Sequence, residues 1–270
     1  MPFEIHEERG LVWLTSSMLS GVHHGFSTRR GGVSSPPFDS LNLGIGRGDE
    51  LAAVQENYRR FCTAVGTSPK EAVLSQQTHS SNIRTVTQAD AGKGLLCQRD
   101  YRDVDALITR VPGLALTVFS ADCGILLLYD PVQNAAGAVH AGWRGCAAGI
   151  AEKTVQAMGK QFGSAPCDLL AAIGPCIQLC CFETDADVPE AMRSTLGADA
   201  EPYLQWRAPK WHVDLAGLNR QWLLRAGLLP SHIENSGLCT ACRPDLFWSH
   251  RKMGEARGAQ VAMISLNSPV

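Results

Sequence analysis

Two histidines and one cysteine stand where short apolar runs end, and their side chains could form a metal site or a catalytic centre. Cys123 follows an apolar run and has Asp122 as its neighbour, while His140 ends another apolar run just before a glycine-flanked helix start. His79 lies at the centre of the polar stretch 75–82, between two apolar runs. Core packing alone does not explain a thiol beside a carboxylate at a strand end.

One thiolate and two imidazoles are the donor set of a catalytic zinc site, in which three protein ligands hold the metal and a fourth position stays open. Spacing alone does not decide this, because 44 residues separate His79 from Cys123 and 17 separate Cys123 from His140. Two alternatives stay open. Cys123 could be a nucleophile, with either histidine as base and Asp122 as orienting group. Alternatively, the histidines are hydrogen-bonded strand ends and Cys123 is a core thiol.

The chain has ten cysteines, and two further groups of them could bind a metal together. Cys176-x-x-x-Cys180-Cys181 and Cys239-x-x-Cys242 would close a four-cysteine structural zinc site if their two loops meet. The first spacing is loose, and neither group is flanked by a knuckle-like glycine turn. Buried thiols near a loop are therefore the preferred interpretation.

Two common motifs are excluded by their residues. Zinc deaminases of the cytidine type use H-x-E followed by P-C-x-x-C, but Ala141 and Gly142 follow His140, and the second cysteine after Pro175-Cys176 comes one residue late. The glycines at 44, 46 and 48 do not spell G-x-G-x-x-G, so a dinucleotide fold is not predicted.

Charge and length exclude several classes of protein. The 270 residues carry 24 Lys+Arg against 26 Asp+Glu, a net charge of −2, which argues against nucleic-acid and acidic-membrane partners. The acidic N-terminus does not resemble a signal peptide, and Asp122 interrupts the most apolar window, 114–129. We therefore expect a soluble cytoplasmic protein, in which cysteines stay reduced.

Hydrophobic periodicity predicts helices at about 51–65, 147–162 and 214–226. Apolar or alternating runs predict strands at 72–74, 82–87, 104–108, 114–119, 125–129, 136–140, 169–173 and 260–265. The connection 130–134 is too short for a crossover helix and predicts a hairpin. We expect one α+β domain, residues 1–270, with mixed or antiparallel sheets flanked by helices.

Motifs along most of the chain, from about Gly25 to Ile264, carry a resemblance to a known family. They are Gly25-Phe26-Ser27-Thr28-Arg29, Gly31-Gly32-Val33-Ser34, Ser40-Leu41-Asn42-Leu43, Gln76-x-x-His79, Asp103-x-Asp105-Ala106-Leu107, Ala121-Asp122-Cys123, His140-Ala141-Gly142-Trp143-Arg144-Gly145, Ile173-Gly174-Pro175-Cys176-Ile177 and Ser249-His250-Arg251. In this order they resemble the multicopper polyphenol oxidase or laccase-domain family, also called the purine nucleoside phosphorylase or peptidoglycan editing factor family.

The resemblance implies a fold similar to the catalytic domain of the cytotoxic necrotizing factor toxins. It also implies zinc-dependent phosphorolysis of adenosine, inosine and methylthioadenosine, with deamination of adenosine as a further activity. The family's metal ligands and catalytic residues correspond to His79, Cys123 and His140. Phosphate and nucleoside are the expected partners, and the expected substrate-binding residues are Arg29, Asn42, Gln76, Asp122, Arg144 and Arg251. Copper is the alternative metal, but eight histidines without an H-x-H pair cannot supply the several copper sites of a laccase.

The chain departs from the family pattern at three places. It has Gln77-Thr78-His79-Ser80 where the family usually has Gln-Val-His-Gly, Ile125 where a proline is usual, and His250-Arg251-Lys252 where Tyr-Arg-Arg is usual. Alternative functions are a cysteine hydrolase or amidase that edits peptidoglycan precursors, polyphenol oxidase activity, and a binding protein with a structural metal. The sequence does not predict the oligomeric state.

Overall fold

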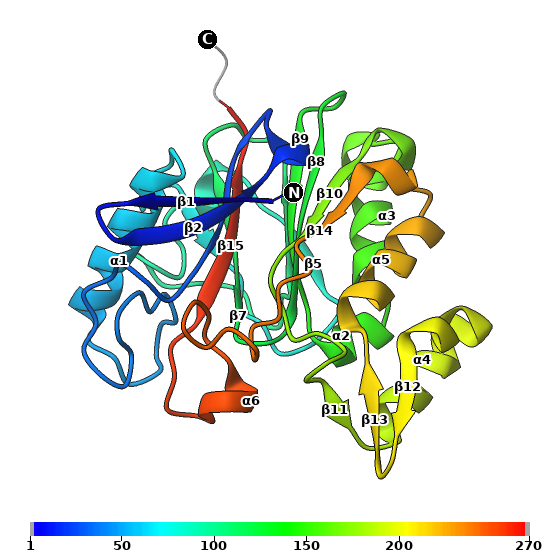
Figure 1. Ribbon diagram of the computed structural model, residues 1–270. Helices are drawn as coiled ribbons and strands as arrows, with labels where there is room; N and C mark the ends of the chain where they lie inside the picture. Colours follow the sequence, from blue (N-terminus) through cyan, green and yellow to red (C-terminus); the bar gives the residue numbers. More distant parts are fainter. Residues whose placement is uncertain (1–2, 268–270) are drawn as a thin grey trace.

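The computed structural model describes residues 3–267, which form two six-stranded sheets packed against each other and a small three-stranded sheet (Figure 1). The first sheet has the order β1 (Phe3–Glu8), β2 (Leu11–Ser16), β3 (His23–Ser27), β15 (Gln260–Ser265), β7 (Ala115–Ser120), β4 (Ala72–Leu74). The second has the order β14 (Ile233–Asn235), β10 (Leu170–Ile173), β8 (Gly124–Asp130), β9 (Ala135–Ala141), β6 (Ala106–Thr109), β5 (Ile83–Thr85). Both sheets are mixed, because β4–β7, β5–β6 and β10–β14 are parallel and the other described pairs in them are antiparallel.

Helices cover the outer face of each sheet, which gives four layers (Figure 1). Helix α1 (Leu51–Ala64) packs on the first sheet, and α3 (Ile150–Phe162) and α5 (Leu215–Arg225) pack on the second. Successive side chains of a strand point to opposite faces, so Val261 and Met263 of β15 pack toward α1 while Ala262 and Ile264 pack between the sheets. Burial on both faces explains why the central strands are continuous apolar runs.

The remaining elements lie at one end of the layers. The small sheet consists of β11 (Glu183–Thr184), β13 (Lys210–Val213) and β12 (Leu204–Arg207) and lies beside α4 (Asp187–Leu196). Two short helices, α2 (Trp143–Ala147) and α6 (His250–Met253), lie near the same end in Figure 1.

The predicted mixed sheets flanked by helices are confirmed, and so is the hairpin at 130–134, which joins antiparallel β8 and β9. The helix predicted at 147–162 is wrong at its start: Gly149, with φ of +72°, separates α2 from α3. Strands β1 to β3 were not predicted. Most side chains of β1 face solvent, including Ile5 at 60% exposure, so this strand has no apolar pattern. The single domain and the likeness to the toxin domain stay predictions.

The chain passes twice from the first sheet to the second, and both crossings contribute to the site described below. Residues 75–82 join β4 to β5, and residues 121–123 join β7 to β8. In the β8–β9 ladder, His140 pairs with Ile125, two residues after the second crossing. This topology brings His79, Cys123 and His140 to one place although they are distant in sequence.

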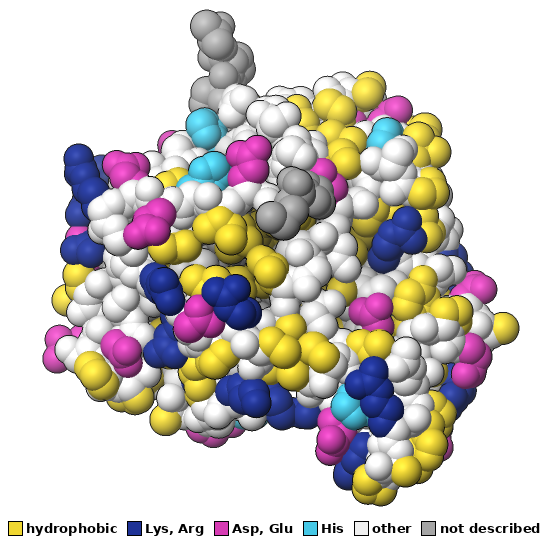
Figure 2. Space-filling view, in the orientation of Figure 1, with side chains coloured by type: hydrophobic (Ala, Val, Ile, Leu, Met, Phe, Trp, Pro, Cys, Tyr) yellow, Lys and Arg dark blue, Asp and Glu magenta, His cyan; other side chains and the backbone are white. Residues whose placement is uncertain are grey.

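Acidic and basic side chains are interspersed over the face shown in Figure 2, without a continuous positive stripe on that face. This distribution agrees with the net charge of −2. Within residues 3–267, the structure has no helix of the length and apolar character needed to cross a membrane.

Candidate active site

His79, Cys123 and His140 converge, with one ligand atom of each within 4.8 Å of those of the others. Cys123 Sγ lies 3.7 Å from His79 Nε2. The two imidazole rings have centroids 5.0 Å apart and planes at 77°. His140 is buried, Cys123 is half-buried and His79 is exposed, so the cluster opens to solvent on the His79 side.

Asp105, immediately before β6, holds two of these three residues in place. Its buried carboxylate accepts a hydrogen bond of 2.8 Å from His140 Nδ1, which leaves Nε2 of that ring to face the cluster. It also accepts the backbone N–H groups of Thr78, His79 and Ser80 at 3.0, 3.1 and 3.0 Å. Burial alone would raise the pKa of Asp105, but the hydrogen bonds from His140 and from the backbone lower it to about 2.

The thiol of Cys123 and the imidazole of His140 shift each other's pKa in opposite directions. Burial alone would raise the pKa of Cys123, but the charge of His140 and hydrogen bonds from His140 and His79 lower it to about 6. Burial alone would lower the pKa of His140, but the Cys123 thiolate and the hydrogen bond to Asp105 raise it to about 9. These opposite shifts favour a thiolate on Cys123 beside an imidazolium on His140, and the thiolate is the form that binds metals and attacks electrophiles.

Two backbone features shape the cluster. His79 has φ of +66° and Asp122 has φ of +92°. Residues other than glycine rarely adopt such backbone angles, and those that do are often found at functional sites. Gly142 is needed for space: a Cβ atom there would lie 2.7 Å from His79 Cδ2 and 3.0 Å from Cys123 Sγ.

Two adjoining cavities of about 230 and 400 Å³ meet at the cluster and share Arg47, His79, Ala121, Cys123 and Arg257 in their linings. The smaller cavity also contains polar groups from residues 75–77, including Gln76, and reaches His140. The larger one has an apolar wall. That wall is formed by Trp143, Ile177, Phe182 and Leu215.

Arg47 and Arg257, which no sequence motif indicated, line both cavities, and Arg99, which donates to the Ser75 carbonyl, lines the smaller one. Arg257 is 8% exposed, and its Nε is a buried donor without a hydrogen-bond acceptor among the described residues. Burial and the nearby charge of Arg47 lower the pKa of Arg257. Two like charges at a partly buried surface attract an anion, because an anion relieves their repulsion and can accept from the unpaired Arg257 Nε.

Asp122 and Arg251, two of the predicted substrate-binding residues, lie in the wall of the larger cavity, but their side chains already have protein partners. The carboxylate of Asp122 accepts hydrogen bonds from Thr240 Oγ1 at 2.6 Å and from the Arg251 backbone N–H at 2.7 Å. The guanidinium of Arg251 donates to the carbonyls of Cys181 and Glu183. Orienting a histidine was one of the roles left open for Asp122, and in the structure the contact with His140 Nδ1 is made by Asp105.

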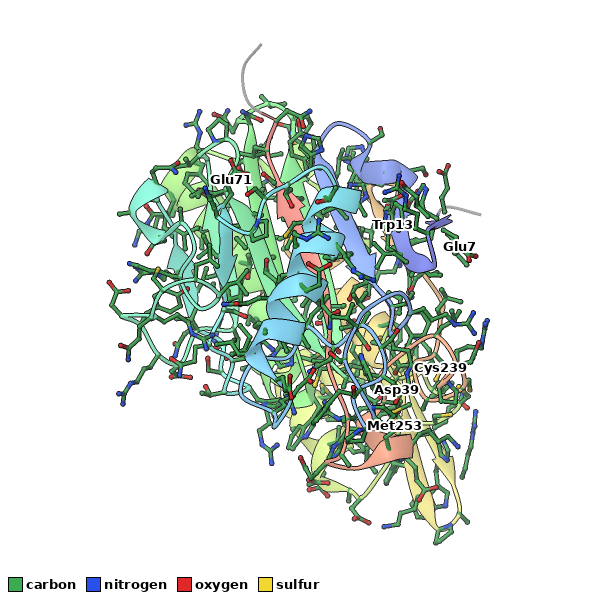
Figure 3. All side chains as sticks on the ribbon, turned by 90° about the vertical axis from the view of Figure 1, so that its left-hand side faces the viewer. Glu7, Trp13, Asp39, Glu71, Cys239 and Met253 are labelled. Atoms are coloured by element: carbon green, nitrogen blue, oxygen red, sulfur yellow. The ribbon has the colours of Figure 1, made fainter. Side chains whose placement is uncertain are left out.

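Arg29, Asn42 and Arg144 do not line either cavity. The guanidinium of Arg29 stacks on Trp248 and contacts Asp39 and Met253, which are labelled in Figure 3. Buried Asn42 holds its own loop by accepting the N–H groups of Gly44 and Ala259. Arg144 is exposed and stacks on Trp143. Contact of these three residues with substrate therefore has no support from their positions.

Sequence reasoning missed Asp105, Arg47 and Arg257 as functional residues. Asp105 was within a motif that carried the resemblance, which was a usable signal, although nothing in it indicated the contact with His140. Arg47 lies among the glycines of residues 44–48, whose spacing matches no motif and so gives no signal for this residue. Arg257 is in a loop without any motif.

The cluster fits a metal ion. It offers one thiolate and two imidazoles in mutual reach. His140 donates its other ring nitrogen to a carboxylate, which is the usual second contact of a metal-binding histidine. The exposed side toward the cavities leaves room for a further ligand. The structure therefore contains a possible His/Cys metal site.

Residues 23–267 match the family model described as multi-copper polyphenol oxidoreductase laccase. The chain belongs to this family. It is 36% identical over 247 residues to the Bacillus subtilis protein named purine nucleoside phosphorylase YlmD, covering 90% of this chain and 87% of that protein. It is 37% identical over 238 residues to the Streptomyces coelicolor protein named purine nucleoside phosphorylase SCO2081, covering 87% of this chain and 91% of that protein.

Solved structures of this family have the same fold. YlmD from Geobacillus stearothermophilus superposes with a TM-score of 0.92 at 34% sequence identity, covering 99% of both chains. The Bacillus licheniformis protein YfiH gives the same TM-score at 33% identity, covering 98% of this chain and 99% of that one. The resemblance inferred from the motifs is thus confirmed.

Proposed function

We propose that this protein is a zinc-dependent purine nucleoside phosphorylase. The observation that carries the proposal is the juxtaposition, in adjoining cavities, of the His79, Cys123 and His140 cluster with the guanidinium groups of Arg47 and Arg257. Phosphorolysis needs a site for an anion beside a site for a polar sugar and an apolar base. The names of the curated relatives support the same activity.

His79, Cys123 and His140 would hold the zinc ion, and Asp105 would orient His140. Zinc has no redox chemistry and suits a set of one thiolate and two imidazoles, whereas the several histidine clusters of a laccase are missing from the described residues. When bound, the ion would polarise a substrate oxygen or lower the pKa of a bound water.

Arg47 and Arg257 bind phosphate in this proposal. Their planar groups offer paired N–H donors to phosphate oxygens, and the buried Nε of Arg257 gains the acceptor that it lacks among residues 3–267. This assignment replaces Arg29 and Arg144, whose guanidinium groups stack on aromatic rings outside the cavities, and Arg251, whose guanidinium binds carbonyls.

The purine stacks on the apolar wall of the larger cavity, where Trp143 and Phe182 supply aromatic surfaces. Gln76 and Asp122 lie at the edges of the two cavities and contact the ribose or the base. In the reaction, a phosphate oxygen forms a bond to the anomeric carbon of the ribose. The bond from this carbon to the purine nitrogen breaks, and its electron pair leaves with the base.

The test is incubation of the purified protein with inosine, adenosine or methylthioadenosine, with and without phosphate, followed by chromatography of the free base. We expect base release that requires phosphate and is lost in Cys123→Ala, while Cys167→Ala, which changes an exposed cysteine elsewhere, keeps full activity. Full activity of metal-free Cys123→Ala would refute the proposal. The same incubation with adenosine shows whether inosine forms, as deamination predicts.

A second candidate is a cysteine hydrolase. Cys123, His140 and Asp105 are arranged in space as a nucleophile, a base and an orienting carboxylate. The pKa of Cys123 is also lowered to about 6. Chelation separates the two candidates. A zinc phosphorylase loses activity when its metal is removed, whereas a thiol nucleophile keeps its activity and loses it to an alkylating agent.

A further inference from the structure

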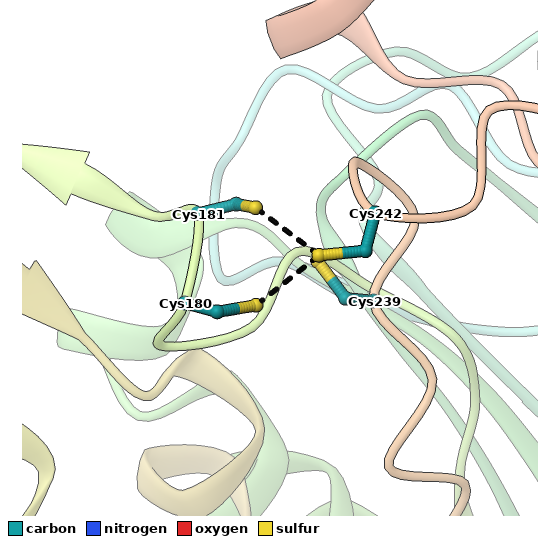
Figure 4. Close-up of side chains that lie close together, drawn as sticks. All are labelled: Cys180, Cys181, Cys239 and Cys242. Atoms are coloured by element: carbon teal, nitrogen blue, oxygen red, sulfur yellow. Dashed lines mark hydrogen bonds between the residues drawn. The ribbon is translucent and has the colours of Figure 1, made fainter.

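Four cysteines outside the candidate active site form a second cluster of thiols, and the mechanism above does not use them. Cys180 and Cys181 belong to the loop between β10 and β11, and Cys239 and Cys242 belong to the segment that follows β14. Their sulfur atoms all lie within 4.8 Å of one another (Figure 4). Cys242 Sγ is 3.5 Å from Cys180 Sγ and 3.4 Å from Cys181 Sγ.

These distances fit a tetrahedral metal site better than a disulfide. Four thiolates at the usual zinc–sulfur distance of about 2.3 Å have sulfur atoms about 3.8 Å apart. Disulfide sulfurs are about 2.05 Å apart, and all four cysteines are free thiols in the structure. Because Cys242 lies close to two different cysteines, a single disulfide would also leave two thiols of the group without a partner.

The two loops meet for a reason built into the fold. Strands β10 and β14 are parallel neighbours, so their carboxyl ends lie side by side and the chain leaves both strands at the same end of the sheet. Backbone hydrogen bonds then continue between the segments, from Cys176 N–H to the Leu238 carbonyl and from Thr240 N–H to the Cys176 carbonyl. Within the first loop, the N–H of Cys181 donates to the Gln178 carbonyl. The backbone therefore presents the four thiols without needing a metal to bring them together.

We propose that Cys180, Cys181, Cys239 and Cys242 bind a structural zinc ion, separate from the ion at His79, Cys123 and His140. Four thiolates select a soft divalent metal that accepts tetrahedral geometry, and a closed set of four ligands is typical of structural zinc. Two of the ligands, Cys180 and Cys242, are exposed, so the metal can enter from solvent.

This site would fasten the wall of the larger cavity. Arg251 donates to the Cys181 carbonyl, and Thr240, next to Cys239, donates to Asp122. Ile177 and Phe182, on the first cysteine loop, line the cavity. A zinc ion between the loops thus ties Ile177 and Phe182, which line the cavity, to the segment whose Thr240 holds Asp122.

The test compares the zinc content of purified variants by inductively coupled plasma mass spectrometry and native mass spectrometry. The double variant Cys180→Ser/Cys242→Ser removes two exposed ligands, and Cys97→Ser/Cys167→Ser removes two exposed cysteines elsewhere. We expect the first to lose one zinc per chain relative to wild type, and the second to lose none. Equal zinc content in wild type and Cys180→Ser/Cys242→Ser would overturn the proposal, as would iron in place of zinc.

Cys123→Ala separates this site from the proposed active site, because it changes only the other cluster. We expect Cys123→Ala to keep one zinc and, after exchange with cobalt(II), to show the absorption of a cobalt tetrathiolate. If the active site binds no metal at all, wild type and Cys123→Ala have the same zinc content, and the loss caused by Cys180→Ser/Cys242→Ser is unchanged. The two proposals can therefore fail independently.

A measurement on wild type keeps the proposal testable if the double variant does not fold. Iodoacetamide labelling with peptide mapping should modify the exposed Cys97 and Cys167 rapidly. Cys180 and Cys242, equally exposed by position, should react only after a chelator removes the zinc. Rapid labelling of these two residues before chelation, or a disulfide between them in freshly purified protein, would contradict the proposal.

Discussion

Replacing Asp105 with asparagine should weaken metal binding at the active site about 10- to 100-fold, because this carboxylate positions His140 and the loop that carries His79. It accepts five hydrogen bonds, one from His140, three from successive backbone N–H groups and one from the hydroxyl of Ser80. An asparagine has one acceptor oxygen and one NH₂ group, so either His140 or the backbone of Thr78 and Ser80 would face a donor instead of an acceptor.

The buried contact decides which way the asparagine turns. Leaving His140 Nδ1 without an acceptor costs more than leaving the N–H groups of Thr78 and Ser80, because His140 is buried whereas Thr78 is exposed and Ser80 is half-buried. The amide oxygen should therefore face His140, and the loop should loosen. A 10- to 100-fold loss of affinity corresponds to about 1.4–2.8 kcal/mol, and the loss of folding stability should be about 1–3 kcal/mol.

The assay is a competition titration against a chelator of known zinc affinity, with phosphorolysis of inosine and urea unfolding measured on the same protein. Asp103→Asn is the matched control, because it removes the same charge from a residue only two positions away. The side chain of Asp103 is exposed and accepts hydrogen bonds from Thr78 and Asn82. Unchanged zinc affinity in folded Asp105→Asn, or an equal loss in Asp103→Asn, would refute the assigned role of Asp105.

Three further outcomes can be measured. Gly142→Ala should weaken the free energy of zinc binding more than the free energy of unfolding, because the new Cβ would lie 2.7 Å from the His79 ring. A chelator titration beside urea unfolding checks this. Arg47→Gln should raise KM for phosphate about 10- to 100-fold in steady-state kinetics, while Arg144→Gln, outside the cavities, should not. Asp90 has its pKa lowered from 3.8 to about 2 by backbone and ion-pair contacts that outweigh burial. Ionised Asp90 thus adds about 2 kcal/mol to the free energy of unfolding above pH 4, and this contribution is lost as the pH falls toward 2. Urea titrations should therefore find Asp90→Asn destabilising at pH 7 and progressively less so at lower pH.

The candidate metal ligands could be selected from the sequence because they follow from a local rule. Cys123 and His140 end apolar runs that become strands buried on both faces, and His79 lies in a long polar segment between two strands. Polar residues that follow or end such strands lie at the ends of the strands and in the loops between them, where binding and catalytic residues are concentrated. What the rule does not give is the partner of each residue. Asp122, next to Cys123 in the sequence, was one candidate for the orienting group, but His140 donates to Asp105.

Which arginines line the cavities could not be predicted from the sequence. Arg29 and Arg144 were selected because they lie in motifs, yet their guanidinium groups stack on tryptophans outside the cavities. Arg47 and Arg257 enter the same cavities from loops 210 residues apart in the chain, and each loop is polar and without a periodic pattern. Whether an arginine reaches a site from such a loop depends on tertiary packing, which a single sequence does not encode in a readable pattern.

The four-cysteine cluster also depends on tertiary structure that the sequence does not show. The sequence supplied the ligands and the condition that their two loops must meet. The condition is met because β10 and β14 are parallel neighbours in the sheet, although helices α4 and α5 and the small sheet lie between them in the chain. Strand β14 has only three residues, Ile233–Asn235, of which one is buried, and was not predicted. Without that strand, nothing in the sequence indicated that Cys239 and Cys242 would face Cys180 and Cys181, so the pairing of one short edge strand determines whether these thiols can share a metal.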